Sequence, residues 1–306
     1  MYRVAVLMST FNGEKYLREQ IDSILAQEGV DVTLYIRDDG SSDSTVEIIK
    51  GYQKNNSNIR LDIGKNMGVG NSFMQLVYDV GDDFDYYAFS DQDDVWHPEK
   101  IYRAVEMIKT EVAPCLYCSN QILVEKDGTI IAERHEHQIH KDYLGILCNN
   151  EVTGCTMLWN KGLHDLLSDA KRRPSQKLLR IRIHDVWVAM VASTVGIICY
   201  DTGSYIDYRQ HDNNVVGVKK RSLINEWSIK IMNPELRNGR SILAEEIYDK
   251  FRDLIKMQSI SNSLKICKDY RTSMKSKIHL LKDADIQRCS KESKTLYIMK
   301  ILLNLF

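Results

Sequence analysis

The sequence predicts an α/β fold: a mixed, mostly parallel sheet flanked by helices, followed by a helical C-terminal appendage. Short apolar runs alternate with helical patterns over the first hundred residues, which is typical of a parallel sheet with helices on both faces. Two of these runs are followed directly by clusters of carboxylates. In a parallel sheet, residues at this end of a strand lie at the edge where ligands bind. From Lys219 onward the chain is rich in helix formers and basic residues.

The elements follow in order from the apolar periodicity. In the first expected helix, Leu17, Ile21 and Ile24 fall on one face. Ser44 and Glu47 form a capping box, so a helix should begin there. We expect strands over residues 3–8, 32–36, 59–63 and 85–90, and helices over residues 17–25, 44–52, 71–78 and 98–109, the last with a proline at its start.

Beyond residue 110 the pattern shifts from parallel to antiparallel pairing. Residues 126–129 predict a hairpin turn between two strands, 121–124 and 130–132. Cys115 and Cys118 lie in a strand pattern and point to opposite faces, so no zinc site is expected there. We divide the chain into a first domain (1–218), whose two halves meet near residue 110, and a basic helical region (219–306).

Composition is that of an ordinary globular protein. Its 306 residues suffice for one large domain and an appendage, with 43% hydrophobic and 27% charged residues. No signal peptide precedes the first strand, and no apolar run approaches the roughly 18 residues that span a bilayer. Seven cysteines, an odd number, favour a reducing compartment. We therefore expect a cytoplasmic protein with no nucleic-acid partner.

Three carboxylates, Asp91, Asp93 and Asp94, stand within four positions directly after the apolar run 86–89. Carboxylates this close repel one another and raise each other's pKa values unless a cation holds them together. At the end of a buried strand, such a cluster indicates a site for a hard divalent metal that carries phosphate oxygens. A solvated acidic loop is the alternative, but Pro98 and two flanking aromatic residues fix the cluster at a strand-to-helix turn.

A second acidic turn follows the strand expected at 32–36. Asp38 and Asp39 stand at the end of that strand, where a carboxylate accepts from a base N–H or a ribose hydroxyl. Residues 64–70 are rich in glycine and lead into another helix N-terminus, whose free N–H groups suit a diphosphate or a pyrimidine ring. For residues 42–44, a well-capped turn is sufficient explanation.

Several segments together resemble the family 2 glycosyltransferases of the GT-A fold. The match begins with Val4–Gly13, Asp38–Ser41 and Asp91–Asp94, in the family's order, with the nucleotide turns first and the metal cluster about fifty residues later. Thr153–Asn160 looks like the acceptor-side segment. Tyr208–Asn214 is similar to a segment of bacterial rhamnosyltransferases that build cell-surface polysaccharides. The resemblance covers roughly residues 1–217. It implies that residues 1–218 are the GT-A catalytic domain, with a nucleotide-sugar half over about 1–110 and an acceptor half over about 111–218.

The resemblance implies a nucleotide-diphosphate sugar as donor and a divalent metal, Mn²⁺ or Mg²⁺, as cofactor. It assigns the metal to Asp93, with Asp91 as a second ligand or as a partner of the ribose or sugar hydroxyls. His211 stands in a polar loop, and its imidazole suits Mn²⁺, so we add it to the metal ligands. The residues expected to bind the donor are Thr10, Asn12, Asp38, Asp39, Asn66, Asp91, Arg209 and Gln210.

By position in the family pattern, Asp185 is the catalytic base. His184 precedes it where the family usually has Glu. Asp185 also precedes an apolar helix, and a helix N-terminus lowers the pKa of a carboxyl and weakens it as a base unless burial under Trp187 offsets this. A plain N-cap aspartate is the alternative. His135, His137 and His140 form a second cluster, for which an acceptor lid or simple solvation is favoured over a metal.

The C-terminal region carries 19 basic against 10 acidic residues from Lys219 to Phe306, a net charge of about +9. Two apolar stripes run through it, one along residues 242–255 and one along 298–305. Three uses of this region are open: packing on the catalytic domain, docking on an anionic membrane, and a homodimer contact. Docking would insert the stripe that ends at Phe306 and place the protein on the inner face of the plasma membrane.

The sequence thus predicts a metal-dependent inverting glycosyltransferase that moves a sugar to a hydroxyl of a saccharide or lipid-linked acceptor. The resemblance near His211 favours L-rhamnose from dTDP-rhamnose, for a bacterial cell-surface polysaccharide. A UDP-hexose transferase of the same fold is the first alternative. A sugar-nucleotide nucleotidyltransferase and a non-catalytic nucleotide-binding module are further ones; the first normally has a basic Gly-rich phosphate loop, and Ser9–Gly13 contains no Arg or Lys.

Overall fold

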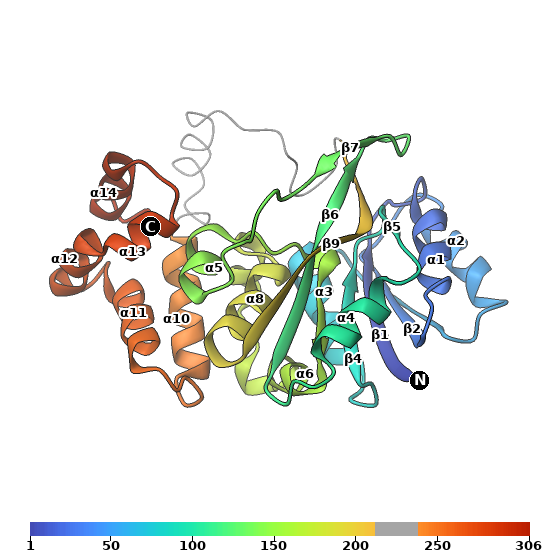
Figure 1. The fold of residues 1–306 in the computed structure, drawn as a ribbon, viewed down its shortest axis with the longest axis horizontal. Helices are drawn as coiled ribbons and strands as arrows, with labels where there is room; N and C mark the ends of the chain where they lie inside the picture. Colours follow the sequence, from blue (N-terminus) through green and yellow to red (C-terminus); the bar gives the residue numbers. More distant parts are fainter. Residues whose placement is uncertain (212–237) are drawn as a thin grey trace.

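The computed structural model describes residues 1–211 and 238–306 (Figure 1). Its strands are β1 (Tyr2–Thr10), β2 (Val30–Asp38), β3 (Ile59–Ile63), β4 (Tyr86–Ser90), β5 (Val95–Trp96), β6 (Cys115–Val124), β7 (Ile130–Glu133), β8 (Leu158–Asn160) and β9 (Ile197–Arg209). The helices of the first part are α1 (Leu17–Leu25), α2 (Thr45–Gln53), α3 (Val69–Asp79), α4 (Lys100–Ile108), α5 (Tyr143–Asn149), α6 (Lys161–Ser168), α7 (Gln176–Ile181) and α8 (His184–Val195). Those of the C-terminal part are α10 (Gly239–Phe251), α11 (Gln258–Asp269), α12 (Met274–Lys282), α13 (Ala284–Cys289) and α14 (Lys294–Leu302).

Among the described residues, nine strands form one sheet in the order β3-β2-β1-β4-β8-β6-β9-β5, with β7 pairing to β6. β1 pairs in parallel with both β2 and β4, opposite Leu34 and Ala88 at Val6. The carboxyl ends of these strands therefore meet at one edge of the sheet. β8 is antiparallel to β4 and to β6, which confirms the expected change in pairing beyond residue 110.

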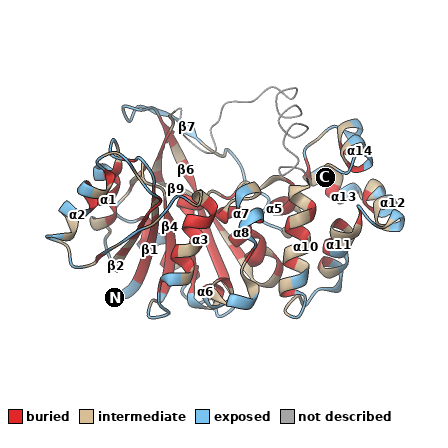
Figure 2. Ribbon diagram, turned by 180° about the vertical axis from the view of Figure 1, so that it is seen from behind, coloured by how far each residue is buried: buried red, intermediate tan, exposed pale blue. Residues whose placement is uncertain are grey.

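The sheet buries apolar side chains on both faces, as its alternating side chains require. Figure 2 shows most of the strand residues in the colour of buried positions. Ala5 and Leu7 of β1 belong to one core cluster, and Val4 and Val6 belong to the other. Cys115 and Cys118 are also divided between the two clusters, so their expected separation is confirmed, and all seven cysteines are free.

Two helix starts differ in detail from the expectation. Ser44 is the N-cap of α2, but its side chain makes no capping hydrogen bond. Asp43 caps the helix instead, because its carboxylate accepts from the Thr45 N–H at 3.0 Å. α4 begins at Lys100, two residues beyond the expected start at Pro98.

The C-terminal helices continue the core of the catalytic part. Leu243, Ile247 and Phe251 of α10 are buried in the cluster that also contains Trp187 of α8. Arg172 pairs with Asp253, one of the ion pairs that join the two parts at their surface. The first apolar stripe therefore packs on the catalytic part, which is one of the three uses left open by the sequence. The domain boundary expected at residue 218 lies outside the described residues.

The end of the chain corrects one expectation. Phe306 is buried, with its ring against those of Tyr270 and Tyr297, because these aromatic side chains close the core of the last helices. Phe306 is therefore not available to insert into lipid as part of the second apolar stripe. No helix among residues 1–211 and 238–306 is both long enough and apolar enough to cross a membrane.

Candidate active site

A cavity of about 840 Å³ opens at the carboxyl edge of the parallel strands. Its walls come from the ends of β1, β2, β4 and β9 and from the N-terminal ends of α3 and α8. Both acidic turns of the sequence reach it, through Asp39 and through Asp91 and Asp93. The topology thus brings together polar residues that lie more than a hundred positions apart.

The structure joins Asp93 to His211. The Asp93 Oδ2 and the His211 Nε2 lie 2.6 Å apart, and the imidazole stacks on the ring of Tyr16 with 5.6 Å between centroids. This separation is that of a hydrogen bond, and two neighbouring ligands of an octahedral Mg²⁺ would lie only slightly farther apart, at about 3 Å. The sequence expectation that these residues converge agrees with this geometry.

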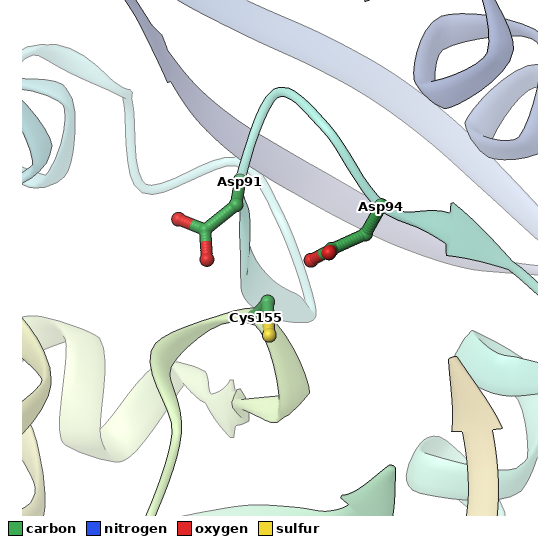
Figure 3. A group of neighbouring side chains, drawn as sticks. All are labelled: Asp91, Asp94 and Cys155. Atoms are coloured by element: carbon green, nitrogen blue, oxygen red, sulfur yellow. The ribbon is translucent and has the colours of Figure 1, made fainter. Parts of the chain in front are cut away.

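Asp91, Asp94 and Cys155 form a second, deeper group, in which the possible ligand atoms all lie within 4.8 Å of one another (Figure 3). The two carboxylates lie on the same side of the turn that joins them, and the thiol lies across from them. Burial raises the pKa of Asp91 to about 7, and the charges of Asp93 and Asp185 add to that increase. Burial likewise raises the pKa of Asp94 well above its usual range.

The donor set fits a hard divalent cation. Carboxylate oxygens and an imidazole suit Mn²⁺ or Mg²⁺. The Oδ2 of Asp94 is buried without a hydrogen-bond partner in the described part of the chain, as expected of an atom that a cation or its water would satisfy. Cys155 fits less well, because burial raises the pKa of its thiol and so keeps it protonated. The metal expected from the sequence therefore has an oxygen-rich place to bind.

Asp185 is the second residue of α8, whose N-cap is Ile183, so the structure does not support the N-cap alternative. Its carboxyl is 8% exposed, faces the cavity and accepts from the Val186 N–H at 2.6 Å. Burial raises the pKa of Asp185 to about 6, so the helix N-terminus does not dominate. A carboxylate with this pKa is ionised at neutral pH and still accepts a proton readily.

His184, the residue before the expected base Asp185, packs against an aromatic side chain. Its ring stacks on Phe73 with 3.9 Å between centroids, and neither ring nitrogen has a hydrogen-bond partner in the described chain. Burial lowers the pKa of His184 to about 3, so the ring is neutral. Gly154 lies against it, because a Cβ at that position would come within 2.9 Å of the His184 Nε2.

The donor side of the cavity is lined by Asn12, Asp39 and Asn66. Asp39 accepts from the backbone N–H groups of Met67 and Gly68 at 3.0 Å each. Asn12 has a φ of 48°, and its Oδ1 accepts from the Ser42 N–H at 2.9 Å. These residues face the cavity as expected, while their hydrogen bonds also fix the turns that carry them.

Thr10 and Asp38 do not line the cavity, and both are fully buried. The Thr10 hydroxyl donates to Asp38 Oδ2 at 3.0 Å, and the backbone N–H groups of Gly40 and Ser41 donate to Asp38 Oδ1. Their expected contact with the donor stays a prediction. Their hydrogen bonds are directed into the turn, so they shape it.

Arg209, which is expected to contact the diphosphate, is held by groups of the protein itself. Its buried guanidinium donates to the backbone oxygens of Asp93 and Lys126, at 3.1 and 2.9 Å, and lies 4.5 Å from the ring centroid of Tyr16. It therefore fixes the loop that carries Asp93. Gln210 does not line the cavity either, and its backbone N–H donates to Val124.

Two contributors were missed by the sequence expectations. The Gln92 side chain pairs with both backbone groups of Phe11, at 2.9 and 3.1 Å, and so joins the first turn to the metal turn. Arg134 lies over the ring of Tyr208 at 5.9 Å, and its Nη1 is shielded from solvent without a partner in the described chain. No local pattern marks either residue, because each acts across the fold.

The cluster of His135, His137 and His140 does not form a metal site. Among residues 1–211 and 238–306, only Asp91, Asp94 and Cys155 group closely enough to share an ion. Burial lowers the pKa of His135, so its ring is neutral at physiological pH.

A model of the family described as "Glycosyl transferase family 2" matches residues 5–167, more than half of the chain. The chain belongs to glycosyltransferase family 2. It is therefore a glycosyltransferase that uses a nucleotide sugar, as the resemblance of its turns implied. The dTDP-rhamnosyl transferase RfbG of Shigella flexneri is 33% identical over 219 residues, which cover 69% of this chain and 73% of that protein. The chondroitin synthase of Escherichia coli is 24% identical over 176 residues, which cover 55% of this chain and 25% of that protein.

Solved structures show the same fold. S. aureus TarS 1-349 superposes with a TM-score of 0.58 at 13% identity, over 98% of this chain and 80% of that one. The same protein in complex with UDP gives a TM-score of 0.55 at 15% identity, over 98% and 91%. The expected GT-A fold of this glycosyltransferase is thereby confirmed.

Proposed function

We propose that this glycosyltransferase is a metal-dependent inverting enzyme that moves L-rhamnose from dTDP-rhamnose to a hydroxyl of a saccharide or lipid-linked acceptor. The reaction would serve the synthesis of a bacterial cell-wall or surface polysaccharide, at the cytoplasmic face of the membrane. The observation that carries the chemistry is a buried Asp185, with its pKa raised to about 6, in the same cavity as the Asp93–His211 pair. The donor rests on the similarity to a dTDP-rhamnosyl transferase.

Asp185 would act as the general base. Its Oδ1 is held by the Val186 N–H, and its other oxygen has no hydrogen-bond partner among the described residues. The acceptor hydroxyl gives its proton to this oxygen as it attacks the anomeric carbon, and the bond from that carbon to the diphosphate oxygen breaks. One base and one displacement invert the anomeric configuration, because attack and departure occur on opposite faces of the sugar.

A divalent ion would be held by the acids of the turn after β4, with Asp91 and Asp94 in the deeper group and the Asp93–His211 pair beside it. When bound, such an ion stabilises the charge that develops on the leaving diphosphate. Asn12, Asp39 and Asn66 would hold the nucleotide on the other side of the cavity.

A UDP-hexose transferase is the second candidate. It is favoured by the likeness to S. aureus TarS, whose structures include complexes with UDP and with UDP-GlcNAc. These relatives are below 20% identical to this chain, so the rhamnose donor stands first. A nucleotide-binding module and a nucleotidyltransferase are the remaining alternatives, but neither requires a buried base in the same cavity as the metal ligands.

A panel of donors separates these candidates. The purified chain is incubated with dTDP-rhamnose, UDP-glucose or UDP-GlcNAc, with and without Mn²⁺, and release of the nucleoside diphosphate is followed with Asp185→Asn as control. The proposal requires metal-dependent release that is most efficient from dTDP-rhamnose. A higher kcat/KM with a UDP-hexose would favour the second candidate, and binding of nucleotides without release from any donor would leave a binding module.

A further inference from the structure

The helices α12 and α14 leave apolar side chains in solvent at the end of the molecule farthest from α1 and α2 (Figure 1). We call this surface the distal face. Its apolar members are Met274 (71% exposed) and Ile278 (46%) of α12, together with Met299 (43%), Leu302 (57%) and Leu303 (56%) at the end of α14. Met274 and Ile278 are four residues apart and so share one side of their helix.

The opposite sides of α12 and α14 pack into the core of the C-terminal helices. Leu280 of α12 and Ile301 of α14 are fully buried in the core, and the Tyr297 hydroxyl donates to the Leu280 carbonyl at 2.6 Å. Lys277 donates to the Asn304 side chain at 2.8 Å, which ties the end of α14 to α12. The distal face is therefore a fixed surface, and its exposed apolar side chains are not there because the helices lack a core.

The distal face is also basic. Residues 271–306 contain eight Lys and Arg against three Asp and Glu, and neither α12 nor α14 contains an acidic residue. Lys275, Lys282 and Lys294 are exposed, and none of them forms an ion pair with a described residue. The three acids are used internally: Asp283 caps α13, Asp285 pairs with Arg288, and Glu292 pairs with two basic side chains.

We propose that the distal face docks this glycosyltransferase on a lipid bilayer that contains anionic headgroups. Unpaired lysines around exposed apolar side chains match a surface with negative charge outside and hydrocarbon beneath. A second copy of the chain is a poorer occupant, because it would oppose like charges across the contact. The proposal goes beyond the transfer reaction and does not depend on the donor. It also assigns the inserted side chains to the distal face and not to the buried Phe306.

Co-sedimentation of the full chain with vesicles tests the proposal. Phosphatidylcholine vesicles with and without phosphatidylglycerol are compared at low and high salt. Binding should require the anionic lipid and weaken as salt screens the lysines. Lys275→Gln/Lys282→Gln should weaken it by on the order of thirtyfold, since each surface lysine contributes a factor of about five. The matched control is Lys50→Gln/Lys54→Gln on α2, which removes the same charge from the opposite end of the molecule.

The apolar part is tested by Met274→Ser/Leu303→Ser, against Met107→Ser/Val112→Ser as a control at exposed sites elsewhere. Only the first pair should lose vesicle binding, while the melting temperature and donor hydrolysis of all variants stay at the level of the unmodified chain. Equal pelleting with neutral and anionic vesicles, or no difference between distal and control variants, would overturn the proposal. Loss of self-association in the Leu303 variant, measured by sedimentation velocity, would instead make the distal face a contact between copies.

Discussion

The two sides of the cavity satisfy their polar groups in opposite ways. On the donor side, Asp39 in the cavity wall accepts from two backbone N–H groups, and Asp38 behind the wall accepts from two more and from two hydroxyls. On the catalytic side, Asp94 has a buried oxygen without a partner in the described chain, and Asp91 and Asp185 have raised pKa values. On the donor side, the protein itself satisfies the carboxylates with hydrogen bonds. On the catalytic side, the negative charge of the carboxylates remains for a ligand to balance.

This difference separates stability from activity. A carboxylate that satisfies backbone donors stabilises the fold, and removing it leaves those donors unpaired. A carboxylate that is buried beside other carboxylates opposes folding, and it remains because a metal or a substrate needs it. Substitutions on the donor side should therefore lower stability first, whereas substitutions on the catalytic side should lower activity while the fold keeps or gains stability.

Asp93→Ala should have the largest effect. It removes the carboxylate that pairs with His211, so metal-dependent turnover should fall by on the order of a thousandfold or more. Thermal stability without metal should not fall, since one of three mutually repelling acids is gone. Donor turnover across a Mn²⁺ titration measures the first effect, with Asp62→Ala, an exposed acid, as control. Near-normal turnover at saturating Mn²⁺ would remove Asp93 from the site.

Asp185→Asn should lower kcat by roughly 10²–10⁴, because the amide cannot take the proton of the acceptor. It should also stabilise the fold at pH 8. The pKa of Asp185 rises from 3.8 to about 6 on folding, so its ionised form costs roughly 3 kcal/mol above pH 6. This cost disappears below the unfolded pKa of 3.8, so wild type and variant should converge at low pH. Urea unfolding at pH 4 and pH 8 measures this; a loss of stability at pH 8 would point to a structural role.

The pH dependence of sugar transfer tests the role of Asp185 on the catalytic side in a second way. Because Asp185 must be ionised to act as base, kcat/KM should fall about tenfold per pH unit below a pH of about 6. The residual activity of Asp185→Asn should lack this acidic limb. Initial rates from pH 4.5 to 8, at saturating donor, provide the comparison. An unchanged limb in the variant would assign it to another group, such as Asp91.

Asp38→Asn tests the donor side. The amide keeps one oxygen acceptor but loses the charge that receives the Gly40 and Ser41 N–H groups, so unfolding free energy should drop by about 1–3 kcal/mol. Donor affinity should fall only through the altered turn, and restoring stability with a saturating donor should recover most of the turnover. Denaturant unfolding and donor titration are the measurements. A stable variant that no longer binds the donor would instead support direct contact between Asp38 and the nucleotide.

The sequence sufficed for the parts of the site that depend on position along a strand. The acids after β2 and β4 had to meet at one sheet edge, because parallel strands place their carboxyl ends together. It did not suffice for the direction in which each polar side chain bonds. Thr10, Asp38 and Arg209 stand in the right segments but point into the protein, and a residue's identity does not distinguish these orientations.

Residues that reach the site from distant elements were beyond sequence reasoning for a different reason. Cys155 meets the acids because η1, the short 3₁₀ helix Gly154–Thr156, packs against β4, and Lys100 is buried over the ring of Trp96 at 3.8 Å. Burial lowers the pKa of Lys100 to about 8, although its charge helps to offset the nearby acids. Such contacts follow from packing of whole elements, and no spacing in the chain reports them.

Arg134→Gln should give the smallest effect on the catalytic side. Burial raises the pKa of Asp185. The positive charges of Arg182 and, to a smaller extent, Arg134 lower this pKa and so limit the increase. Without Arg134, the acidic limb of kcat/KM should therefore move to higher pH by a fraction of a unit, a change of a few-fold in rate near pH 6. Arg134→Lys keeps the charge and should leave the limb in place even though the stacking on Tyr208 is altered. If both variants lowered the rate equally at every pH, Arg134 would contribute through contact with a substrate and not through its charge on the base.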